Sequence, residues 1–256
     1  MGPLVLAELT AAAMPLLALE RCTKRFGGLV ANREVSLVIE PREIVGLIGP
    51  NGAGKTTLFN CISGHYHPEE GRVLFDGHDV TRSRPDRVCR LGIARTWQIV
   101  RVFGRMTALD NVICGALKRT NRLGEARARA ARLLAFTGLA GKESVLAANL
   151  TLADKKRLEI TRALATEPRL LLLDEAMSGL TATETAAAVE LVRRIHSELE
   201  LAICVVEHVM EVVMPLSHRV IVLDHGDKIA EGRPEDVARN EQVITAYLGG
   251  SHAGRA

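Results

Sequence analysis

A glycine-rich run at residues 49–56 has the residue types needed to hold a chain of phosphates. It fits the pattern G-x-x-x-x-G-K-[ST]. Glycines let backbone N–H groups curl around phosphate oxygens, and a helix N-terminus adds positive potential. Lys55 can then contact the β- and γ-phosphates, and Thr56 can ligate Mg²⁺. The predicted phosphate-binding residues are Gly49, Pro50, Asn51, Gly52, Ala53, Gly54, Lys55, Thr56 and Thr57.

A plain glycine-rich turn is the alternative to a phosphate site. At ordinary glycine usage, a chance match in a chain of this length is on the order of one in a hundred. The run also follows an aliphatic stretch at 44–48 and precedes a predicted helix, as the phosphate motif requires. We therefore prefer the phosphate site.

Two adjacent acids, Asp174 and Glu175, follow four consecutive leucines. In phosphate-binding α/β proteins, the acidic residue that holds the metal ion lies at the carboxyl end of a buried strand. We expect Asp174 to hold Mg²⁺ through water, and Glu175 to orient or deprotonate the water that attacks the γ-phosphorus. The alternative is that both acids are simply solvated at a strand end. We prefer the metal site, because a phosphate loop at 49–56 needs an acidic residue to hold its metal ion.

Short aliphatic runs alternate with helical stretches around these motifs. This alternation predicts an α/β protein with a buried, mostly parallel sheet covered by helices. The predicted strand and helix pairs are 43–48 with 55–63, 170–173 with 184–199, and 202–206 with 209–214.

Two other regions have different patterns. Residues 35–39 and 72–75, the latter followed by an Asp-Gly turn, predict an antiparallel sheet at the edge of the core. Residues 109–148 are rich in Ala, Arg and Leu without a strand pattern, and 122–139 has a charged helical face, so we predict a separate helical subdomain there. Its arginines are interpreted as a solvated helix surface rather than a phosphate site.

Composition limits the class of protein. The chain has 256 residues, of which 47% are hydrophobic and 25% charged, as in ordinary globular proteins. A net charge of +3 argues against a nucleic-acid binder. The five cysteines lack metal-ligand spacing, which predicts reduced thiols in a cytoplasmic protein. The apolar start at 1–19 is interrupted by Glu8 and Pro15, so we expect neither a membrane span nor export.

The order of the motifs resembles the ATPases of ABC transporters over roughly residues 15–249. The resemblance implies a P-loop NTPase core, an N-terminal antiparallel β subdomain and a helical subdomain. It divides the chain into a core of about 15–98 and 166–249 and a helical subdomain of about 99–165 that carries the signature helix. Residues 1–14 are then a loose extension, with Met14 as an alternative start to Met1, and 250–256 are a tail.

The resemblance also assigns further site residues. Gln98 matches the glutamine of the loop that reaches the metal and the attacking water, and His208 matches the histidine that contacts the γ-phosphate. Phe26, before Gly27-Gly28, resembles the aromatic residue on which adenine stacks. Taken alone, a glutamine, a lone histidine or a phenylalanine beside a turn would carry little meaning.

The signature departs from the family pattern Leu-Ser-Gly-Gly-Gln. Residues 150–154 read Leu-Thr-Leu-Ala-Asp, followed by three basic residues and a predicted helix at 158–165. Thr151 keeps a hydroxyl, and with Ala153 it is expected to face the partner's nucleotide from a capped helix start. Asp154 adds negative charge near a triphosphate unless it folds back on the helix N-terminus. Thr181 stands where the family has Asp or Asn, so communication across the dimer interface is the function most in question.

The C-terminal part of the core, with Glu207-His208-Val209-Met210 and residues 229–234, is similar to the ATPases of importers of branched-chain amino acids and related solutes. This resemblance implies an ATP- and Mg²⁺-dependent motor on the inner face of the membrane. Its partners would be two membrane permease subunits, contacted near Val100, Val102 and Phe103, a second ABC ATPase, and indirectly an extracytoplasmic solute-binding protein, with no nucleic acid.

Three alternatives remain beside the transport motor. An ATP-binding regulatory or partner-dependent subunit with little intrinsic hydrolysis is suggested by the altered signature. A soluble ABC protein of DNA repair or translation normally carries long coiled coils or a second ATPase domain, which this chain lacks. A small-molecule kinase would need an acceptor pocket with a lid, and the ordered series of Gln98, the Leu150 helix and His208 argues against it.

Overall fold

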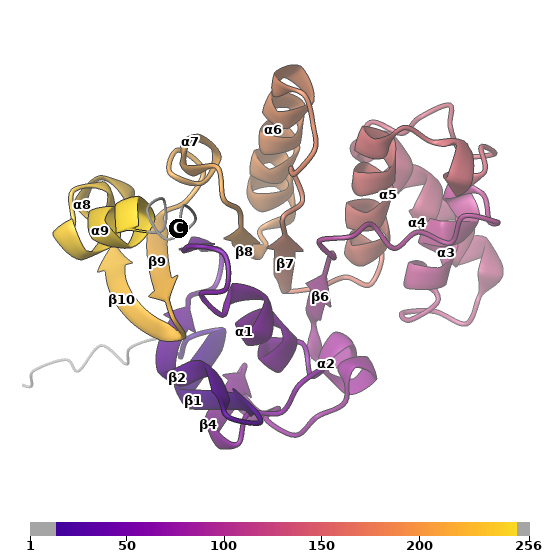
Figure 1. Cartoon of the computed structure of the whole chain (residues 1–256). Helices are drawn as coiled ribbons and strands as arrows, with labels where there is room; N and C mark the ends of the chain where they lie inside the picture. Colours follow the sequence, from indigo (N-terminus) through magenta and orange to yellow (C-terminus); the bar gives the residue numbers. More distant parts are fainter. Residues whose placement is uncertain (1–13, 250–256) are drawn as a thin grey trace, which may run out of the picture.

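The computed structural model describes residues 14–249, which form two β-sheets and a set of helices. In Figure 1 the larger sheet crosses the middle of the molecule, the smaller sheet lies below it, and helices α3, α4 and α5 gather to one side. The predicted extension, apart from Met14, and the predicted tail at 250–256 lie outside the described residues.

The larger sheet has six strands in the order β10-β9-β3-β8-β7-β6. Five of them run parallel and β10 pairs antiparallel to β9 at one edge. Every residue of β3, β7 and β8 is buried, as expected for strands covered on both faces. The strands are β3 (Ile44–Ile48), β6 (Ile93–Arg95), β7 (Leu170–Asp174), β8 (Ala202–Val206), β9 (Arg219–Asp224) and β10 (Asp227–Gly232).

The smaller sheet is antiparallel, in the order β2-β1-β4-β5. Its strands are β1 (Leu17–Phe26), β2 (Leu29–Ile39), β4 (Glu70–Phe75) and β5 (His78–Asp79). The predicted antiparallel segments 35–39 and 72–75 are therefore correct, although β2 begins six residues earlier than predicted.

Ten helical segments connect or cover the strands of residues 14–249. They are α1 (Lys55–Ile62), α2 (Pro85–Leu91), α3 (Ala108–Ala116), α4 (Leu123–Phe136), the 3₁₀ turn η1 (Ala147–Asn149), α5 (Leu152–Leu164), α6 (Ala182–Leu199), α7 (Met210–Val213), α8 (Pro234–Ala238) and α9 (Glu241–Gly249). The helical stretch predicted at 109–148 corresponds to α3, α4 and η1, and the wider range of about 99–165 also contains α5. The helix predicted at 158–165 starts at Leu152 instead, because Thr151 caps it there.

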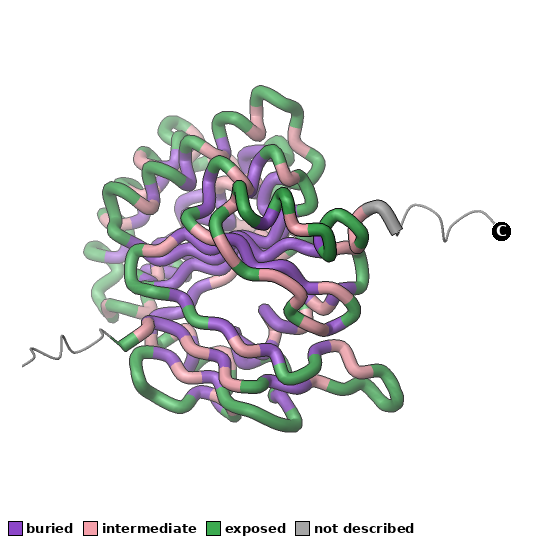
Figure 2. Tube along the Cα trace, turned by 90° about the vertical axis from the view of Figure 1, so that its left-hand side faces the viewer, coloured by how far each residue is buried: buried purple, intermediate pink, exposed green. Residues whose placement is uncertain are grey.

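Helix α1 lies between the two sheets, where Leu58, Phe59 and Ile62 pack in one core with residues of both. The opposite face of the large sheet packs against α5, α6 and α7. A third core, formed by α3, α4 and α5, holds the helical side of the molecule together. Figure 2 shows the buried strands as a continuous layer through the middle of the molecule, with the exposed residues on the outer turns and helices.

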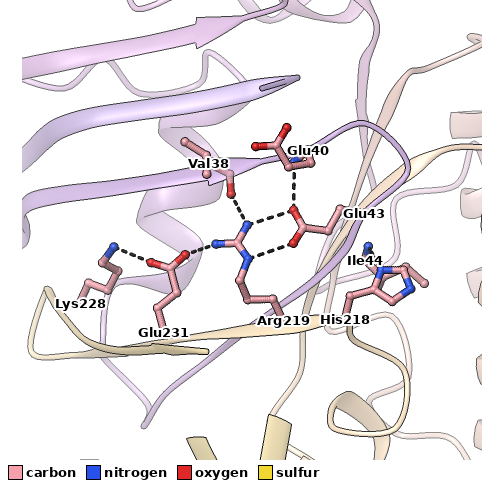
Figure 3. A network of polar contacts seen from close by, with 8 residues as sticks. All are labelled: Val38, Glu40, Glu43, Ile44, His218, Arg219, Lys228 and Glu231. Carbon is pink, nitrogen blue, oxygen red and sulfur yellow. Dashed lines mark hydrogen bonds and ion pairs between the residues drawn. The ribbon is translucent and has the colours of Figure 1, made fainter. Parts of the chain in front are cut away.

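The half-buried guanidinium of Arg219 joins the two sheets (Figure 3). It donates to both carboxylate oxygens of Glu43, at 2.9 and 3.0 Å, and to the carbonyl oxygen of Val38 at the end of β2, at 2.8 Å. A further ion pair reaches Glu231 of β10, which Lys228 also contacts. One side chain thus connects β2, the turn before β3, and the edge strand β10.

Removal of this guanidinium should destabilise the fold. Glu43 and Glu231 are each less than a third exposed, and Arg219→Met removes their main partner. The free energy of unfolding should therefore fall by about 2 to 4 kcal/mol. The exposed pair of Arg42 with Glu200 provides the control, because Arg42→Met should cost about 1 kcal/mol or less. Chemical denaturation followed by circular dichroism measures both, and equal losses would contradict the role given to Arg219.

Candidate nucleotide-binding site

The loop between β3 and α1 is shaped by its glycines. Gly49 and Gly54 have φ of 152° and 99°, and a Cβ atom at either would collide with a backbone carbonyl oxygen, of Leu223 and Ala31 respectively. The loop curls so that the Lys55 ammonium donates to the carbonyl oxygens of Gly49, at 2.7 Å, and Pro50, at 2.8 Å. Burial lowers the pKa of Lys55, although the nearby Glu175 and Asp174 act in the opposite direction.

A cavity of about 440 Å³ lies over this loop, within the size range of small-molecule sites. It brings together residues 51–57, Phe26, Gln98 and Glu175, all predicted for the site. Gly49, Pro50, Asp174, His208, Thr151 and Ala153 do not line it. The lining also includes Leu29, Val30, Ala31 and His225, which the sequence analysis did not identify because no local motif marks them.

Asp174 is completely buried at the carboxyl end of β7. Its Oδ2 accepts a hydrogen bond from Arg95 at 2.6 Å, while Oδ1 has no hydrogen-bond partner among residues 14–249. Burial raises the pKa of this carboxyl, and Arg95 opposes the effect. Arg95 escaped the sequence analysis, since its partner lies 79 residues away. The unpaired Oδ1 is suited to a further ligand, a water or a cation.

Glu175 gathers the other two polar residues of the site. Its backbone is left-handed, with φ of 49°, which is uncommon for a residue other than glycine. Oε2 accepts a hydrogen bond from Gln98 Nε2 at 2.9 Å and lies 2.8 Å from His208 Nε2. The structure therefore brings Gln98, Glu175 and His208 together, and their catalytic roles stay predictions.

Phe26 lies at the mouth of the cavity and is 43% exposed. Its ring meets that of Tyr66 edge to face at 5.2 Å, with the Lys24 ammonium 5.3 Å from the Phe26 ring centre. An exposed ring held by a second aromatic residue can stack on a planar base. Tyr66 is a site neighbour that no sequence signal indicated.

The altered signature keeps a capped helix start. The Thr151 hydroxyl accepts a hydrogen bond from the Asp154 N–H at 3.2 Å and begins α5. Asp154 is buried and pairs with Lys142 and with Arg157 at 3.7 Å, so its charge is neutralised. Thr181 likewise begins α6 with Glu184 in a reciprocal capping box. Both substitutions therefore retain a helix start that is capped by a hydroxyl.

A phosphate-binding loop, an acidic strand end and a polar cluster around Glu175 define a P-loop ATPase with a helical subdomain. A model described as ABC transporter matches residues 32–178, and one described as branched-chain amino acid ATP-binding cassette transporter matches residues 228–253. The chain belongs to the ABC transporter family of ATP-binding proteins, as the sequence analysis predicted.

Curated relatives match nearly the whole chain. The high-affinity branched-chain amino acid transport ATP-binding protein LivG of Escherichia coli is 39% identical over 93% of this chain and 99% of its own length. BraF of Pseudomonas aeruginosa, with the same description, is 37% identical over 92% and 98%. The methionine import protein MetN of Leifsonia xyli is 38% identical over 88% of this chain and 67% of its own length.

Solved structures share the fold. An ATP-binding cassette of an ABC transporter in its ADP conformation has a TM-score of 0.83 and 28% identity, covering 92% of this chain and 99% of that one. A dimeric cassette in a post-hydrolysis state, bound to ADP and phosphate, has a TM-score of 0.77 and 26% identity, covering 85% and 98%. The predicted fold class is confirmed.

A buried acid beside the site supplies a test of its electrostatics. Burial raises the pKa of Glu207 from 4.5 to about 6, although its bond from the Met177 N–H and the charge of Lys156 act the other way. Because the folded chain holds this proton more tightly than the unfolded chain, ionisation of Glu207 destabilises the fold as the pH rises from 4.5 through 6, by about 2 kcal/mol in all.

Glu207→Gln should therefore gain stability relative to the unmodified protein as the pH rises from 4.5 to 7, by up to about 2 kcal/mol. Denaturation curves at several pH values measure the difference. Glu190→Gln, which removes a carboxylate on the exposed side of α6, is measured in parallel as the control substitution. Parallel pH curves for Glu207→Gln and the unmodified protein would contradict the raised pKa of Glu207.

Proposed function

We propose that this chain is the ATP-hydrolysing motor subunit of an importer of branched-chain amino acids or related small solutes. The proposal that the chain hydrolyses ATP rests mainly on one observation. Gln98 and His208 both contact the same carboxylate oxygen of Glu175, beside the phosphate loop. The names of LivG and BraF and the match at residues 228–253 support the solute class.

The residues suit ATP with Mg²⁺. Magnesium is usually held by one or two carboxylates, with phosphates and water completing its shell. Thr56, Gln98 and, through water, Asp174 would hold it, and the unpaired Oδ1 of Asp174 fits such a contact. The bound ion would neutralise charge that develops on the phosphates. Phe26 would stack on adenine, and backbone N–H groups of residues 49–57 would bind the phosphates.

Hydrolysis would then depend on positioning and charge. Lys55 would exchange its two carbonyl contacts for phosphate oxygens, and Glu175 would align the attacking water, held in place by Gln98 and His208. The neutralised charge of Asp154 removes the main reason to prefer a regulatory subunit with little hydrolysis.

A second ATPase copy or a similar chain would complete each site. In the single chain Thr151 and Ala153 lie outside the nucleotide cavity, on the start of α5. A dimer in which each α5 faces the other's nucleotide would use them, and the dimeric cassette bound to ADP and phosphate supports the formation of a dimer. Two permease subunits would dock beside the helical subdomain of about 99–165, with a solute-binding protein outside the cell.

The proposed location is the inner face of the membrane, bound to those permeases. No helix within residues 14–249 has the length and apolar content needed to cross a bilayer. The coupling surface would include the exposed Phe103 and the half-buried Val100 and Val102.

Glu175→Gln tests the catalytic proposal. Loss of one aligned catalytic group should cost about 3 to 4 kcal/mol of barrier, so Mg²⁺-dependent ATP hydrolysis should fall by over about a hundredfold. An ATP-stabilised dimer should accumulate in the same sample, measured by size-exclusion chromatography with light scattering. Glu190→Gln serves as the control. Full turnover by Glu175→Gln would remove Glu175 from the mechanism, and ATP binding without turnover or dimer in the unmodified chain would favour the regulatory subunit.

The solute class needs a transport measurement. Disruption of the gene in its native cells should abolish uptake of labelled leucine at low concentration, because the motor supplies the free energy of transport. The unmodified gene should restore uptake and the Glu175→Gln gene should not. Uptake of urea, a short amide and methionine is measured in parallel, and a defect confined to one of those would reassign the solute.

A further inference from the structure

One side of α5 faces the catalytic core with three charged residues, Lys156, Glu159 and Arg162, spaced three apart. The Lys156 ammonium donates to the carbonyl oxygen of Glu175 at 2.8 Å. Arg162 donates to the carbonyl oxygen of Arg101. Glu159, between them, accepts hydrogen bonds from backbone N–H groups at both ends of the segment 97–101.

The hydrogen bonds of Glu159 go to that segment, and an ion pair at 3.9 Å joins the same carboxylate to Arg162 of α5. Its Oε1 accepts from the N–H of Arg101 at 3.0 Å, and its Oε2 from the N–H of Trp97 at 3.4 Å. The residue is only 3% exposed, and burial raises its pKa while these two N–H groups oppose the rise. A buried carboxylate is costly unless it is hydrogen-bonded, so these bonds determine where the segment can lie.

The contacts form a closed ring. Glu159 holds both ends of the segment that presents Gln98, and the Gln98 side chain donates to Glu175. The backbone of Glu175 returns to α5 through Lys156. The same helix begins at Thr151, the end expected to face the partner's nucleotide. A displacement of α5 therefore acts on the catalytic residues of its own chain.

We propose that Glu159 is a positioning residue that fixes segment 97–101 to α5, so that engagement of Thr151 by the partner's nucleotide sets the position of Gln98 against Glu175. Glu159 touches neither nucleotide nor water in this scheme and acts through the backbone of Trp97 and Arg101. The proposal rests on the proposed function, because it assumes that α5 meets a second nucleotide.

Trp97 offers a direct readout of this segment. It is the only tryptophan in the chain. Its ring is bracketed by the guanidinium groups of Arg95 and Arg101, whose central carbons lie 4.3 and 4.2 Å from the ring centre, and His65 meets it edge to face. Tryptophan emission depends on such neighbours, so movement of the segment should change the spectrum.

The experiment compares Glu159→Ala with the unmodified chain. Truncation removes two charge-assisted hydrogen bonds, so kcat for Mg²⁺-dependent ATP hydrolysis should fall about tenfold or more. KM for ATP should change less than about twofold, because the phosphate loop and Phe26 are untouched. The change in Trp97 emission on addition of Mg²⁺ with a non-hydrolysable ATP analogue should be lost. Glu159→Gln, which keeps one acceptor oxygen, should recover part of both.

Glu143→Ala is the matched control, since the side chain of this half-buried glutamate accepts a hydrogen bond from the N–H of Gly141, outside segment 97–101. It should preserve kcat and the emission change. A purely structural role for Glu159 predicts a lower unfolding midpoint with an unchanged emission response, and that result, or an unchanged kcat in Glu159→Ala, would overturn the proposal. If circular dichroism shows that Glu159→Ala does not fold, Glu159→Gln takes its place. The proposal is then refuted if kcat and the change in Trp97 emission both equal those of the unmodified chain.

Failure of the proposed function gives a different pattern. In that case the unmodified chain shows no turnover that depends on Glu175, whereas its emission still responds to the analogue. The comparison of emission between Glu159→Ala and the unmodified chain then still decides whether Glu159 holds the segment.

Discussion

Buried charges at the carboxyl ends of two parallel strands, β3 and β7, which lie on either side of β8, are the constraint on which this structure depends. Lys55 follows β3, and Asp174 and Glu175 end β7, all three within the protein interior. Charges at such a depth must be paired or hydrogen-bonded, since desolvation would otherwise outweigh their attraction. Each charge has its own partner in the fold. Lys55 donates to the loop carbonyls, Arg95 pairs with Asp174, and Gln98 and His208 contact Glu175. A nucleotide triphosphate with its cation would replace the carbonyl contacts of Lys55 and would use the unpaired Oδ1 of Asp174, so the other pairings of the site would already be formed before binding.

Helix α5 joins this charged centre to the helical subdomain. Its apolar residues divide between two cores, with Leu158 packed among α3 and α4 and Ile160 against the large sheet. Its charged side contacts segment 97–101 through Glu159. A helix that belongs to two cores can move only if both cores accommodate the movement, and its polar contacts determine which residues of the site move with it.

The sequence predicted the features that depend on neighbours along the chain. The phosphate loop and the acidic pair have strict spacing, and the three core strands were placed within one residue because each is a short aliphatic run. Contacts between distant segments could not be predicted this way. Arg95 meets Asp174 across 79 residues, and Tyr66 meets Phe26 without any motif. The start of α5 was placed late because the basic run at 155–157 hides the apolar period, although Thr151 carried the cap signal.

The departures from the signature pattern show why backbone geometry matters more than residue identity at a helix start. Leu152 and Ala153 stand where the family pattern has two glycines. At this start of α5, Leu152 is exposed and Ala153 is buried. The hydroxyl of Thr151 occupies the cap, and Lys142 removes the negative charge of Asp154 from the surface where a partner's phosphate would approach. A phosphate that approached this point in the proposed dimer would meet a helix N-terminus, which favours negative charge. An exposed apolar side chain remains at this helix start, because Leu152 Cδ2 lies 3.3 Å from the position that a Cβ atom added to Gly179 would take. In the proposed dimer the bulk of Leu152, rather than charge, would limit how closely the two chains approach at this point.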